Sequence, residues 1–418
     1  MLIRTLLNRC QKFKSFVYRK VRFERIAGLE SLVLELEPRK NSHAQCSICG
    51  QQAGTYDHQS QSRLFRFVPL WGIATYLSYR MRRVNCPEHG VRIEAVPWAS
   101  GKSPRTRALE LFLARWARRV SWKEAALCFE VSWEQVYRSV KTVVEYGLKR
   151  RSLDGIESIG VDEVQYAKGP KYMTVVYQID EGFKRLVSVT EGRTARSFLR
   201  FFRMLGPQRT AQLKYICSDM WKPYLKVVAK KAPQALHILD RFHIVANLNK
   251  ALDEIRASEA RQMVRQGYQE VLKYTKYCFL KRKENLTPKQ KIKLKEVLQY
   301  DLKTVRAFLL KESFQLLWAY TSPHWARWYL KKWCGRANRS RLVPIKKFVR
   351  SMRKHQEKIF NWFRAKKLIS AGIVEGFNRK INLTTRKAYG YRSFEVLRIA
   401  LFHTLGNLEE PESTHRFC

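Results

Sequence analysis

The strongest constraint on the fold is a set of five β-type runs between residues 156 and 240. The first three runs follow one another across short turns, and a helix-like segment precedes each of the last two. The first run leads to Asp162 and the fourth ends at Asp219. From Arg241 to about Lys367 the apolar spacing is helical throughout, so the sheet is complete by Asp240. The pattern predicts a mixed α/β unit followed by an all-α segment.

Two of these runs carry acids suited to metal-dependent chemistry. In a ribonuclease H-like sheet the first and fourth strands are neighbours, so Asp162 and Asp219 would project toward one point and hold divalent cations. A helix further along would supply a third acid, for which Glu375 is the candidate. Cleavage of a phosphodiester uses a metal-activated water and a second metal on the leaving oxygen. Glu163 would point to the opposite strand face and is the weaker candidate.

Two short motifs near the N-terminus have zinc-ribbon spacing: CSICG at residues 46–50 and CPEHG at 86–90. Each motif puts two ligands on one side of a tight turn, and the following glycine lets the backbone amides face the thiolates. Four protein ligands leave no open position, so we expect a structural Zn²⁺ held by Cys46, Cys49, Cys86 and His89. His43 and His58 are alternative ligands, and a coincidental grouping of reduced cysteines is the competing interpretation.

Residues 121–147 have the pattern of two helices joined by a short turn, which is the shape of a helix-turn-helix. Ser132 can cap the second helix, with Val136 and Val140 facing inward. The side chains expected to enter the major groove are Trp133, Gln135, Arg138 and Lys141. An ordinary helical hairpin that packs two domains together is the competing interpretation.

The charge of the chain indicates a polyanionic partner. Its 418 residues include 81 Lys and Arg against 35 Asp and Glu, and the excess of +46 is spread along the whole sequence. Such chains bind nucleic acid by neutralising phosphates. No apolar run approaches the roughly 20 residues that span a bilayer, and no secretory signal is evident, so we expect a cytoplasmic protein with no membrane partner. Nine scattered cysteines, an odd number, argue against a disulfide framework.

The sequence resembles the transposases of the ISL3 group of bacterial insertion sequences over nearly its whole length. Residues 160–180 are similar to that group's first-acid segment, 218–224 to its second, and 374–402 to its third-acid helix and the segment that follows. Residues 239–256 resemble a further segment that contains an Asp and, three residues on, a His. The finger departs from the family in having His89 where a cysteine is usual, and residues 383–385 replace part of a more basic stretch.

The resemblance implies a multidomain α/β protein with a zinc ribbon, a helix-turn-helix and a ribonuclease H-like core that carries an α-helical insertion. It also implies Mg²⁺ (or Mn²⁺) at Asp162, Asp219 and Glu375, with Asp240 and His243 supporting the active site or a displaced nucleotide; a helix cap and a surface histidine are the alternative. The expected divisions are 1–100 (zinc ribbon), 101–153 (helix-turn-helix), 154–243 and 369–406 (core), 244–368 (insertion) and 407–418 (a frayed tail).

The expected function is that of an insertion-sequence transposase in the bacterial nucleoid. It would bind the terminal inverted repeats in double-stranded DNA and catalyse metal-dependent strand cleavage and transfer to target DNA, as a homodimer or larger assembly on the ends. A DNA-binding regulator without catalysis and a structure-specific nuclease of the same fold are the rival functions. The insertion interleaves basic residues with tryptophans, any of which could stack on an unpaired base, although core packing is the commoner role: Trp318, Trp325, Trp328, Trp333 and Trp362.

Overall fold

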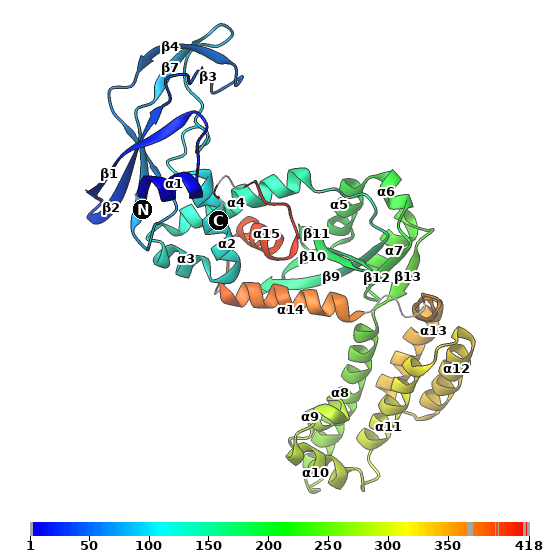
Figure 1. Ribbon diagram of the computed structural model, residues 1–418. Helices are drawn as coiled ribbons and strands as arrows, with labels where there is room; N and C mark the ends of the chain where they lie inside the picture. The colour runs from blue at the N-terminus through cyan, green and yellow to red at the C-terminus, as the bar shows by residue number, and fades with distance from the viewer. Residues whose placement is uncertain (1–2, 366–370, 389, 392, 413–414, 416–418) are drawn as a thin grey trace. The chain divides into compact units, whose positions relative to one another are not determined.

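The chain divides into two compact units in the computed structural model, which describes residues 3–365, 371–388, 390–391, 393–412 and 415. The first unit comprises Met1–Ser152 and Ile381–Cys418, and the second comprises Leu153–Lys380 (Figure 1). No helix among the described residues is long and apolar enough to cross a membrane.

The first unit begins with a helix and a four-stranded sheet of order β1-β2-β6-β5. Their bounds are α1 (Ile3–Cys10), β1 (Phe16–Ile26), β2 (Leu29–Pro38), β5 (Arg63–Arg66) and β6 (Ala74–Tyr79). Trp98 is buried among aromatic rings, with centroids 4.8 Å from Phe16 and 5.4 Å from Tyr79. These rings give the sheet a core of its own. The sequence predicted a zinc ribbon in residues 1–100, but it did not predict α1 or a division of this region into two sheets.

The second sheet of this unit has the order β3-β4-β7-β8 and carries both cysteine motifs. Its strands are β3 (Ala44–Gln45), β4 (Gln52–His58), β7 (Arg82–Cys86) and β8 (Gly90–Ile93). Arg82 and Glu94 form a buried ion pair of 2.8 Å, and Tyr79 of the first sheet donates a hydrogen bond of 2.6 Å to the same carboxylate. This network ties the two sheets together.

Three helices follow: α2 (Arg107–Arg119), α3 (Trp122–Cys128) and α4 (Trp133–Arg150). Ser121 and Ser132 each form a reciprocal capping box at the start of α3 and α4, which explains why the chain turns sharply between them. Val136 and Val140 are fully buried, as predicted. Helix α15 (Phe394–Leu405) packs against α4.

The expected fraying of residues 407–418 is wrong for the part that the structure describes. Glu410 pairs with Arg115 at 2.8 Å and with Arg118 at 3.2 Å. A Cβ placed on Gly147 would lie 2.6 Å from the Cβ of Leu408, so the tail lies directly on α4. Charge pairing and this close approach hold the segment, and neither is visible in its local composition.

The second unit contains a five-stranded sheet of order β11-β10-β9-β12-β13. The strands are β9 (Ser158–Ala167), β10 (Lys171–Asp180), β11 (Phe183–Glu191), β12 (Tyr215–Ser218) and β13 (Leu236–Leu239), which confirms the five predicted runs. Strand β10 is antiparallel to both β9 and β11, whereas β12 is parallel to both β9 and β13. The first and fourth strands of the unit are therefore neighbours, as expected.

The two faces of this sheet are covered by different helices. On one face Ile159 and Val161 join the core formed with α5 (Ala195–Leu205) and α7 (Lys222–Lys231), and the short α6 (Pro207–Ala211) follows α5 along the chain. Side chains alternate along a strand, so Gly160 and Asp162 face the other way. There they meet α14 (Ala371–Lys387): a Cβ on Gly160 would lie only 2.5 Å from Cγ2 of Val374.

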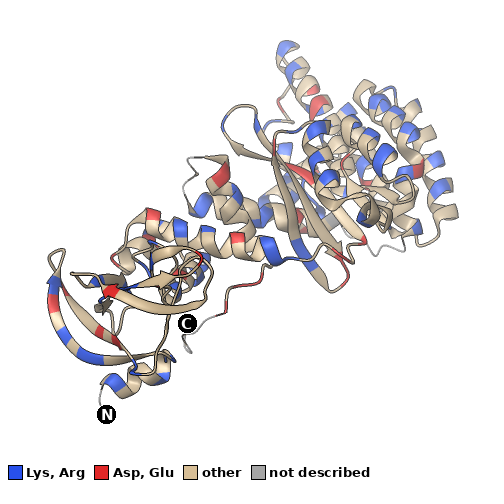
Figure 2. Cartoon of the chain, turned by 90° about the horizontal axis from the view of Figure 1, so that it is seen from above, with Lys and Arg blue, Asp and Glu red and all other residues tan. Residues whose placement is uncertain are grey.

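The long helical segment lies between β13 and α14. It comprises α8 (Arg241–Arg265), α9 (Lys276–Leu280), the 3-10 helix η1 (Lys283–Asn285), α10 (Pro288–Val297), α11 (Lys303–Gln315), the 3-10 helix η2 (Leu316–Ala319), α12 (Pro323–Arg339) and α13 (Val343–Arg364). Thr287 caps α10 through its side chain. Residues 266–275 are not helical, contrary to the expectation, because Gly267 and Tyr274 adopt positive φ and break the helix. Basic positions recur along these helices (Figure 2).

Candidate active site, metal centre and DNA-binding helices

Three aspartates stand level on three adjacent parallel strands: Asp162 lies within β9, and Asp219 and Asp240 directly follow β12 and β13. In the register of β9 with β12, Asp162 and Asp219 each lie two residues beyond the paired Gly160 and Cys217. In the register of β12 with β13, Asp219 and Asp240 directly follow the last paired residues. From the sequence, Asp162 and Asp219 were expected to project toward one point. The backbone register adds Asp240 as a third at the same level.

Backbone amides hold one oxygen of each carboxylate. Asp162 Oδ1 accepts the N–H of the next residue at 2.8 Å, and Asp219 Oδ1 does the same at 2.5 Å. Asp240 Oδ1 caps α8 by accepting the N–H two residues on at 2.7 Å. These bonds fix the direction in which each carboxylate points. The Oδ2 atoms of Asp219 and Asp240 are left facing a common neighbour, His243.

His243 lies one turn into α8, among all three carboxylates. Its Nε2 is 3.5 Å from Asp162 Oδ1 and 3.8 Å from Asp240 Oδ2, and its Nδ1 is 3.8 Å from Asp219 Oδ2. Burial alone would lower the pKa of His243, but the contact with Asp162 and the charges of the three acids raise that pKa to about 9. Burial, opposed by His243, raises the pKa of Asp240 to about 6. A positive group therefore offsets the mutual repulsion of the acids.

Helix α14 reaches the acids through Asn378, a residue that the sequence did not single out. Its Nδ2 donates to Asp162 Oδ2 at 2.5 Å, and its Oδ1 accepts from the hydroxyl of Tyr177 at 2.8 Å. Phe377 stacks on the Tyr177 ring, with centroids 4.5 Å apart and planes 14° apart. Asp162 is thus held from the backbone on one oxygen and from α14 on the other.

Glu375 lies on the same helix, one turn before Asn378 and Arg379. Its Oε1 accepts a hydrogen bond of 2.6 Å from Arg379, whose side chain is 77% exposed. Within the described part of the chain no hydrogen bond joins Glu375 to Asp162 or Asp219. The structure therefore places Glu375 on the helix that contacts the acids, with its carboxylate engaged by Arg379.

Glu163 faces the opposite side of the sheet, toward α7. Burial, opposed by the charge of Arg193, raises the pKa of Glu163 to about 7, and Tyr224 of α7 hydrogen-bonds its side chain. Tyr224 also lies in the core under α5 and α7. Strand alternation thus separates Glu163 from the three aspartates, as predicted.

The four expected zinc ligands gather at one point of the first unit. Their ligand atoms all lie within 4.8 Å of one another, including 3.7 Å between the sulfurs of Cys49 and Cys86 and 3.6 Å from Cys86 Sγ to His89 Nδ1. Backbone hydrogen bonds, first from Cys49 and then from the residue before it, lower the pKa of the Cys46 thiol. Cys46 and Cys86 are buried, whereas the alternative ligands His43 and His58 are exposed and lie outside this group.

Comparison with known proteins decides the family. Residues 159–401, more than half of the chain, match the model of ISL3-type DDE proteins, described as transposase. The chain belongs to the ISL3 family of transposases. Residues 42–89 match the zinc finger described for transposases of IS204, IS1001, IS1096 and IS1165. The chain is 29% identical over 391 residues to the transposase for insertion sequence element IS1557 of Mycobacterium tuberculosis (strain CDC 1551 / Oshkosh). That alignment covers 88% of this chain and 86% of the relative. The chain is 26% identical over 353 residues to the transposase for IS1001 of Bordetella parapertussis, covering 84% and 86%.

These matches confirm the predicted family and the predicted function, an insertion-sequence transposase of the DDE type. They also confirm an N-terminal zinc ribbon. A regulator without catalysis is not favoured, since the matched DDE region spans the sheet, the insertion and α14.

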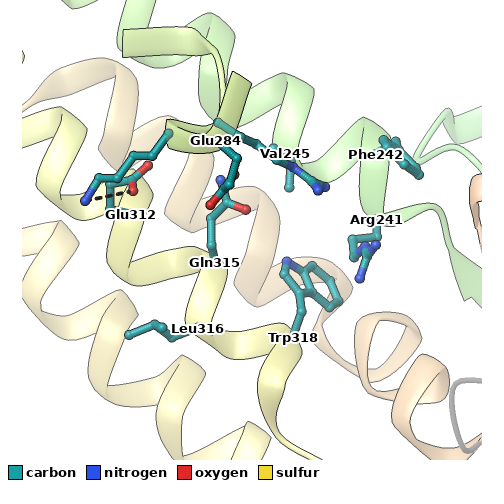
Figure 3. A pocket seen from close by; sticks show the side chains of 10 residues that line it. Arg241, Phe242, Val245, Glu284, Glu312, Gln315, Leu316 and Trp318 are labelled. Atoms are coloured by element: carbon teal, nitrogen blue, oxygen red, sulfur yellow. Dashed lines mark ion pairs between the residues drawn. The ribbon is translucent and has the colours of Figure 1, made fainter. Parts of the chain in front are cut away.

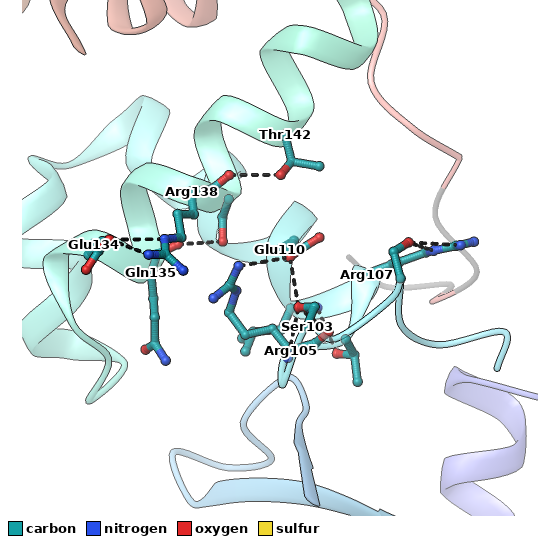
Figure 4. A network of polar contacts seen from close by, with 12 residues as sticks. Ser103, Arg105, Arg107, Glu110, Glu134, Gln135, Arg138 and Thr142 are labelled. Carbon is teal, nitrogen blue, oxygen red and sulfur yellow. Dashed lines mark hydrogen bonds and ion pairs between the residues drawn. The ribbon is translucent and has the colours of Figure 1, made fainter. Parts of the chain in front are cut away.

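The four side chains predicted to contact DNA in this ISL3 transposase are already engaged within α4. Arg138 pairs with Glu134 at 2.5 Å and Lys141 with Glu145 at 3.7 Å. The Gln135 side chain accepts the N–H of the capping Ser132 at 3.1 Å. Figure 4 shows the pair of Arg138 and Glu134. Trp133 is 39% exposed and stacks on the next turn's Tyr137. Exposed i,i+4 ion pairs are weak, so DNA phosphates can replace them.

Asn378 and Tyr177 are the site residues that sequence reasoning missed. Asn378 stands 216 residues from its partner Asp162, and Tyr177 stands in the middle of a buried strand. One signal was available: Asn378 follows Glu375 by three residues, which places both on neighbouring positions of one helical face.

Proposed function

We propose that this transposase binds the terminal inverted repeats of its insertion sequence and cleaves and joins their DNA strands with Asp162, Asp219 and Glu375 as the catalytic acids. The observation that carries the proposal is the register of β9, β12 and β13, which brings Asp162 and Asp219 to one level on adjacent parallel strands. Both then surround His243. Acids grouped in this way are typical of sites for hard cations.

The sheet supports a ribonuclease H-like core. Numbered along this unit, its strands run 3-2-1-4-5, with the second strand antiparallel to its neighbours and the fourth and fifth parallel to the first. We infer that residues 154–243 and the start of α14 form this core, with the helices between as an insertion. The boundaries near 100, 153, 243 and 406 stay predictions, and the predicted boundary at 368–369 lies outside the described residues.

The donors at the sheet edge fit Mg²⁺ or Mn²⁺. They are carboxylate oxygens, which hard divalent cations prefer, and backbone N–H groups already orient one oxygen of each aspartate. Bound cations would supply an activated water or hydroxyl and stabilise the leaving oxygen. Asn378 would keep Asp162 in place, His243 would offset the negative charge of the cluster, and Asp240 would help to hold the imidazole of His243.

Glu375 must leave Arg379 to join the two aspartates. The pair is an exposed i,i+4 contact, whose strength is only about 0.3–0.5 kcal/mol. A DNA phosphate at the exposed guanidinium would compete for it. We therefore infer that the binding of the DNA strand and the turning of Glu375 toward the acids accompany each other.

The first unit would recognise the DNA ends. We propose that Cys46, Cys49, Cys86 and His89 hold a structural Zn²⁺, because three thiols and one imidazole within 4.8 Å form a closed tetrahedral set. Helices α3 and α4 would act as a helix-turn-helix, with Trp133, Gln135, Arg138 and Lys141 toward the duplex. Two protein copies or more would hold the two ends of the element together.

The test is a joining assay with purified protein, labelled element ends, target DNA and Mg²⁺ or Mn²⁺. Asp162→Ala, Asp219→Ala and Glu375→Gln should each lower cleavage and joining by at least about 100-fold while end binding persists, because these acids hold metal rather than phosphate. Glu181→Gln, an exposed acid on a turn of the same unit, is the matched control and should behave as wild type.

Each unexpected result of this assay leads to a different conclusion. Near-normal cleavage by any of the three variants contradicts the assignment of that acid. Cleavage without joining by wild type identifies a nuclease of the same fold, and end binding without cleavage in either metal identifies a DNA-binding protein that has lost catalysis.

A further inference from the structure

A pocket of about 460 Å³ lies beside the first turns of α8, the helix that directly follows Asp240 of the acid cluster. Arg241, Phe242 and Val245 line it from α8, Arg282 lies at the turn before η1, and Trp318 comes from η2 (Figure 3). Arg241 and Val245 are four residues apart and share one face of the helix. His243 lies on the opposite face, among the aspartates. The pocket and the acid cluster are therefore on two sides of the same helical turn.

Aromatic rings hold Arg241 at one end of this pocket. Its guanidinium carbon is 5.7 Å from the Trp362 ring centroid, 5.8 Å from that of Phe242 and 6.0 Å from that of Trp318. Trp318 is buried, stacked on Phe363 with planes 5° apart and edge-on to Trp362. The Trp318 ring thus supports the arginine, and its packing leaves little room for a stacked base.

Arg241 and Arg282 both bring positive charge to the pocket, and among the described residues neither makes an ion pair or side-chain hydrogen bond with a carboxylate. The basic Lys283 differs, since it pairs with Glu312 at 3.6 Å. Glu312 also lies 3.3 Å from Lys311, away from Arg241 in Figure 3. Both arginines line the one pocket. Burial, and then the charge of Arg282, lower the pKa of Arg241, and the charge of Asp240 opposes them, so the two cations repel each other across the pocket. An anion between them would relieve that repulsion.

The distance from the acids suits a neighbouring part of the same DNA strand. The pocket and the acids are separated by one helix, about 10 Å across with its side chains. Successive nucleotides of a stacked strand rise by about 3.4 Å along the helix axis and their phosphates lie farther apart than this rise, so a phosphate at most roughly three nucleotides from the acids would fall at this separation. Arginine suits a phosphate because its fork of N–H groups matches two phosphate oxygens.

We propose that Arg241 and Arg282 bind one backbone phosphate of the DNA strand held at the acid cluster, a few nucleotides from the bond that is cut. Arg241 is then a positioning residue: the rings fix the guanidinium, the guanidinium fixes the phosphate, and the strand is set in register over the acids. The inference rests on the proposed function and adds to it a specific contact with the strand.

The test measures binding of DNA ends in Ca²⁺, without cleavage, to a series of substrates in which one phosphate at a time is replaced by an uncharged methylphosphonate. Wild-type protein should lose about tenfold in affinity at one position within about five nucleotides of the cleaved bond, because a charge-assisted hydrogen bond of this kind is lost there. Arg241→Ala should bind the unmodified end about tenfold more weakly and be insensitive to that one replacement, while keeping its sensitivity elsewhere.

Arg282→Ala serves where Arg241→Ala fails to fold, because Arg282 is exposed and should be removable without harm to the core. Lys289→Ala is the matched control: it removes one exposed charge of the same helical segment outside the pocket, and it should keep the full position-specific sensitivity.

Equal sensitivity in Arg241→Ala, Arg282→Ala and Lys289→Ala overturns the proposal. Inorganic phosphate at millimolar concentration should not abolish the position-specific effect; if it does, the pocket binds free phosphate instead. Wild-type protein that cleaves ends yet shows no sensitive position refutes this inference alone, whereas protein that neither binds nor cleaves ends refutes the proposed function.

Discussion

Replacing Gly160 with alanine should displace the helix that carries Glu375. The new Cβ would lie 2.5 Å from Cγ2 of Val374 and at ordinary distances of 3.6 and 3.7 Å from Ile179. Carbon atoms in contact prefer about 3.5–4.0 Å, so the strand and the helix must separate by about 1 Å. Val374 cannot simply turn aside, because a β-branched side chain has one strongly preferred rotamer in a helix.

The expected cost follows from how α14 is held. Overpacking of this kind costs about 1–3 kcal/mol, and a unit of this size loses roughly 2–4 °C of melting temperature per kcal/mol. The same movement would lengthen the 2.5 Å bond between Asn378 and Asp162. A misplacement of about 1 Å at a reacting centre can lower the rate by about 100-fold, so cleavage should fall far more than stability.

The assay compares thermal unfolding and cleavage for Gly160→Ala, Val374→Ala and the double variant. Val374→Ala removes the atom that clashes, so the double variant should recover most of the cleavage lost by Gly160→Ala, with a coupling energy of about 1–2 kcal/mol in stability. Gly376→Ala is the matched control, since a Cβ there meets nothing within 4 Å. The reasoning is refuted if Gly160→Ala matches Gly376→Ala in both measurements, or if Val374→Ala restores nothing.

Three further predictions concern metal, DNA and acid. Cys46→Ser should release zinc and weaken end binding while sparing catalysis on pre-cleaved ends; wild-type protein purified without chelators and found free of zinc would contradict it. Arg138→Ala should cost about 1–3 kcal/mol of binding free energy and relax discrimination between element ends and random DNA. Lys141→Ala should instead weaken binding to all DNA alike and lower the salt slope of binding by about one. If both variants bind with wild-type affinity and salt slope, α4 is not the element that recognises the ends. Burial, chiefly, lowers the pKa of His237 and of His403 to about 3, so the unfolded chain takes up their protons first and the contribution of each to stability falls as pH drops from 6.5 toward 3. At pH 5.5 each contribution should have lost about 1.4 kcal/mol, measured by urea unfolding as the change between pH 7.5 and 5.5 in the stability difference between wild type and His403→Leu; an unchanged difference would exclude it.

Local periodicity allowed the sheet and its two predicted acids to be placed from the sequence. Strand alternation separates Glu163 from Asp162, and the structure shows Glu163 beside Tyr224 on the far face of the sheet. Asp162 and Asp219 were expected to meet because the first and fourth strands are neighbours in a ribonuclease H-like sheet. The strand positions and the alternation of side chains are local, whereas that strand order is a property of the assumed fold.

Contacts between distant segments were beyond this reasoning. The bond from Asn378 to Asp162 joins residues 216 apart, and the packing of Leu408 against Gly147 joins the tail to a helix far earlier in the chain. Nothing in the composition near Asn378 or Leu408 distinguishes them from solvated positions. Their roles depend on packing between helix and strand, which local patterns do not encode.

The tryptophans of the insertion show the same limit. Trp333 is fully buried, and Trp318 and Trp362 are nearly so, whereas Trp325 and Trp328 are 55% and 44% exposed. All five lie among basic residues in the sequence. Composition alone could not separate the three that fill the core from the two that reach the surface.

Both ends of the helical insertion are anchored to one short strand. Asp240, directly after β13, caps the first helix of the insertion, and Asn361 in its last helix donates a hydrogen bond of 2.8 Å to the carbonyl of His237 on β13. The chain thus leaves the sheet at β13 and comes back to the same strand at the end of the insertion. Helices between those two points could be added, shortened or exchanged during evolution while the acids keep their spacing. A family with this architecture can therefore diversify the DNA that it holds without rebuilding its chemistry.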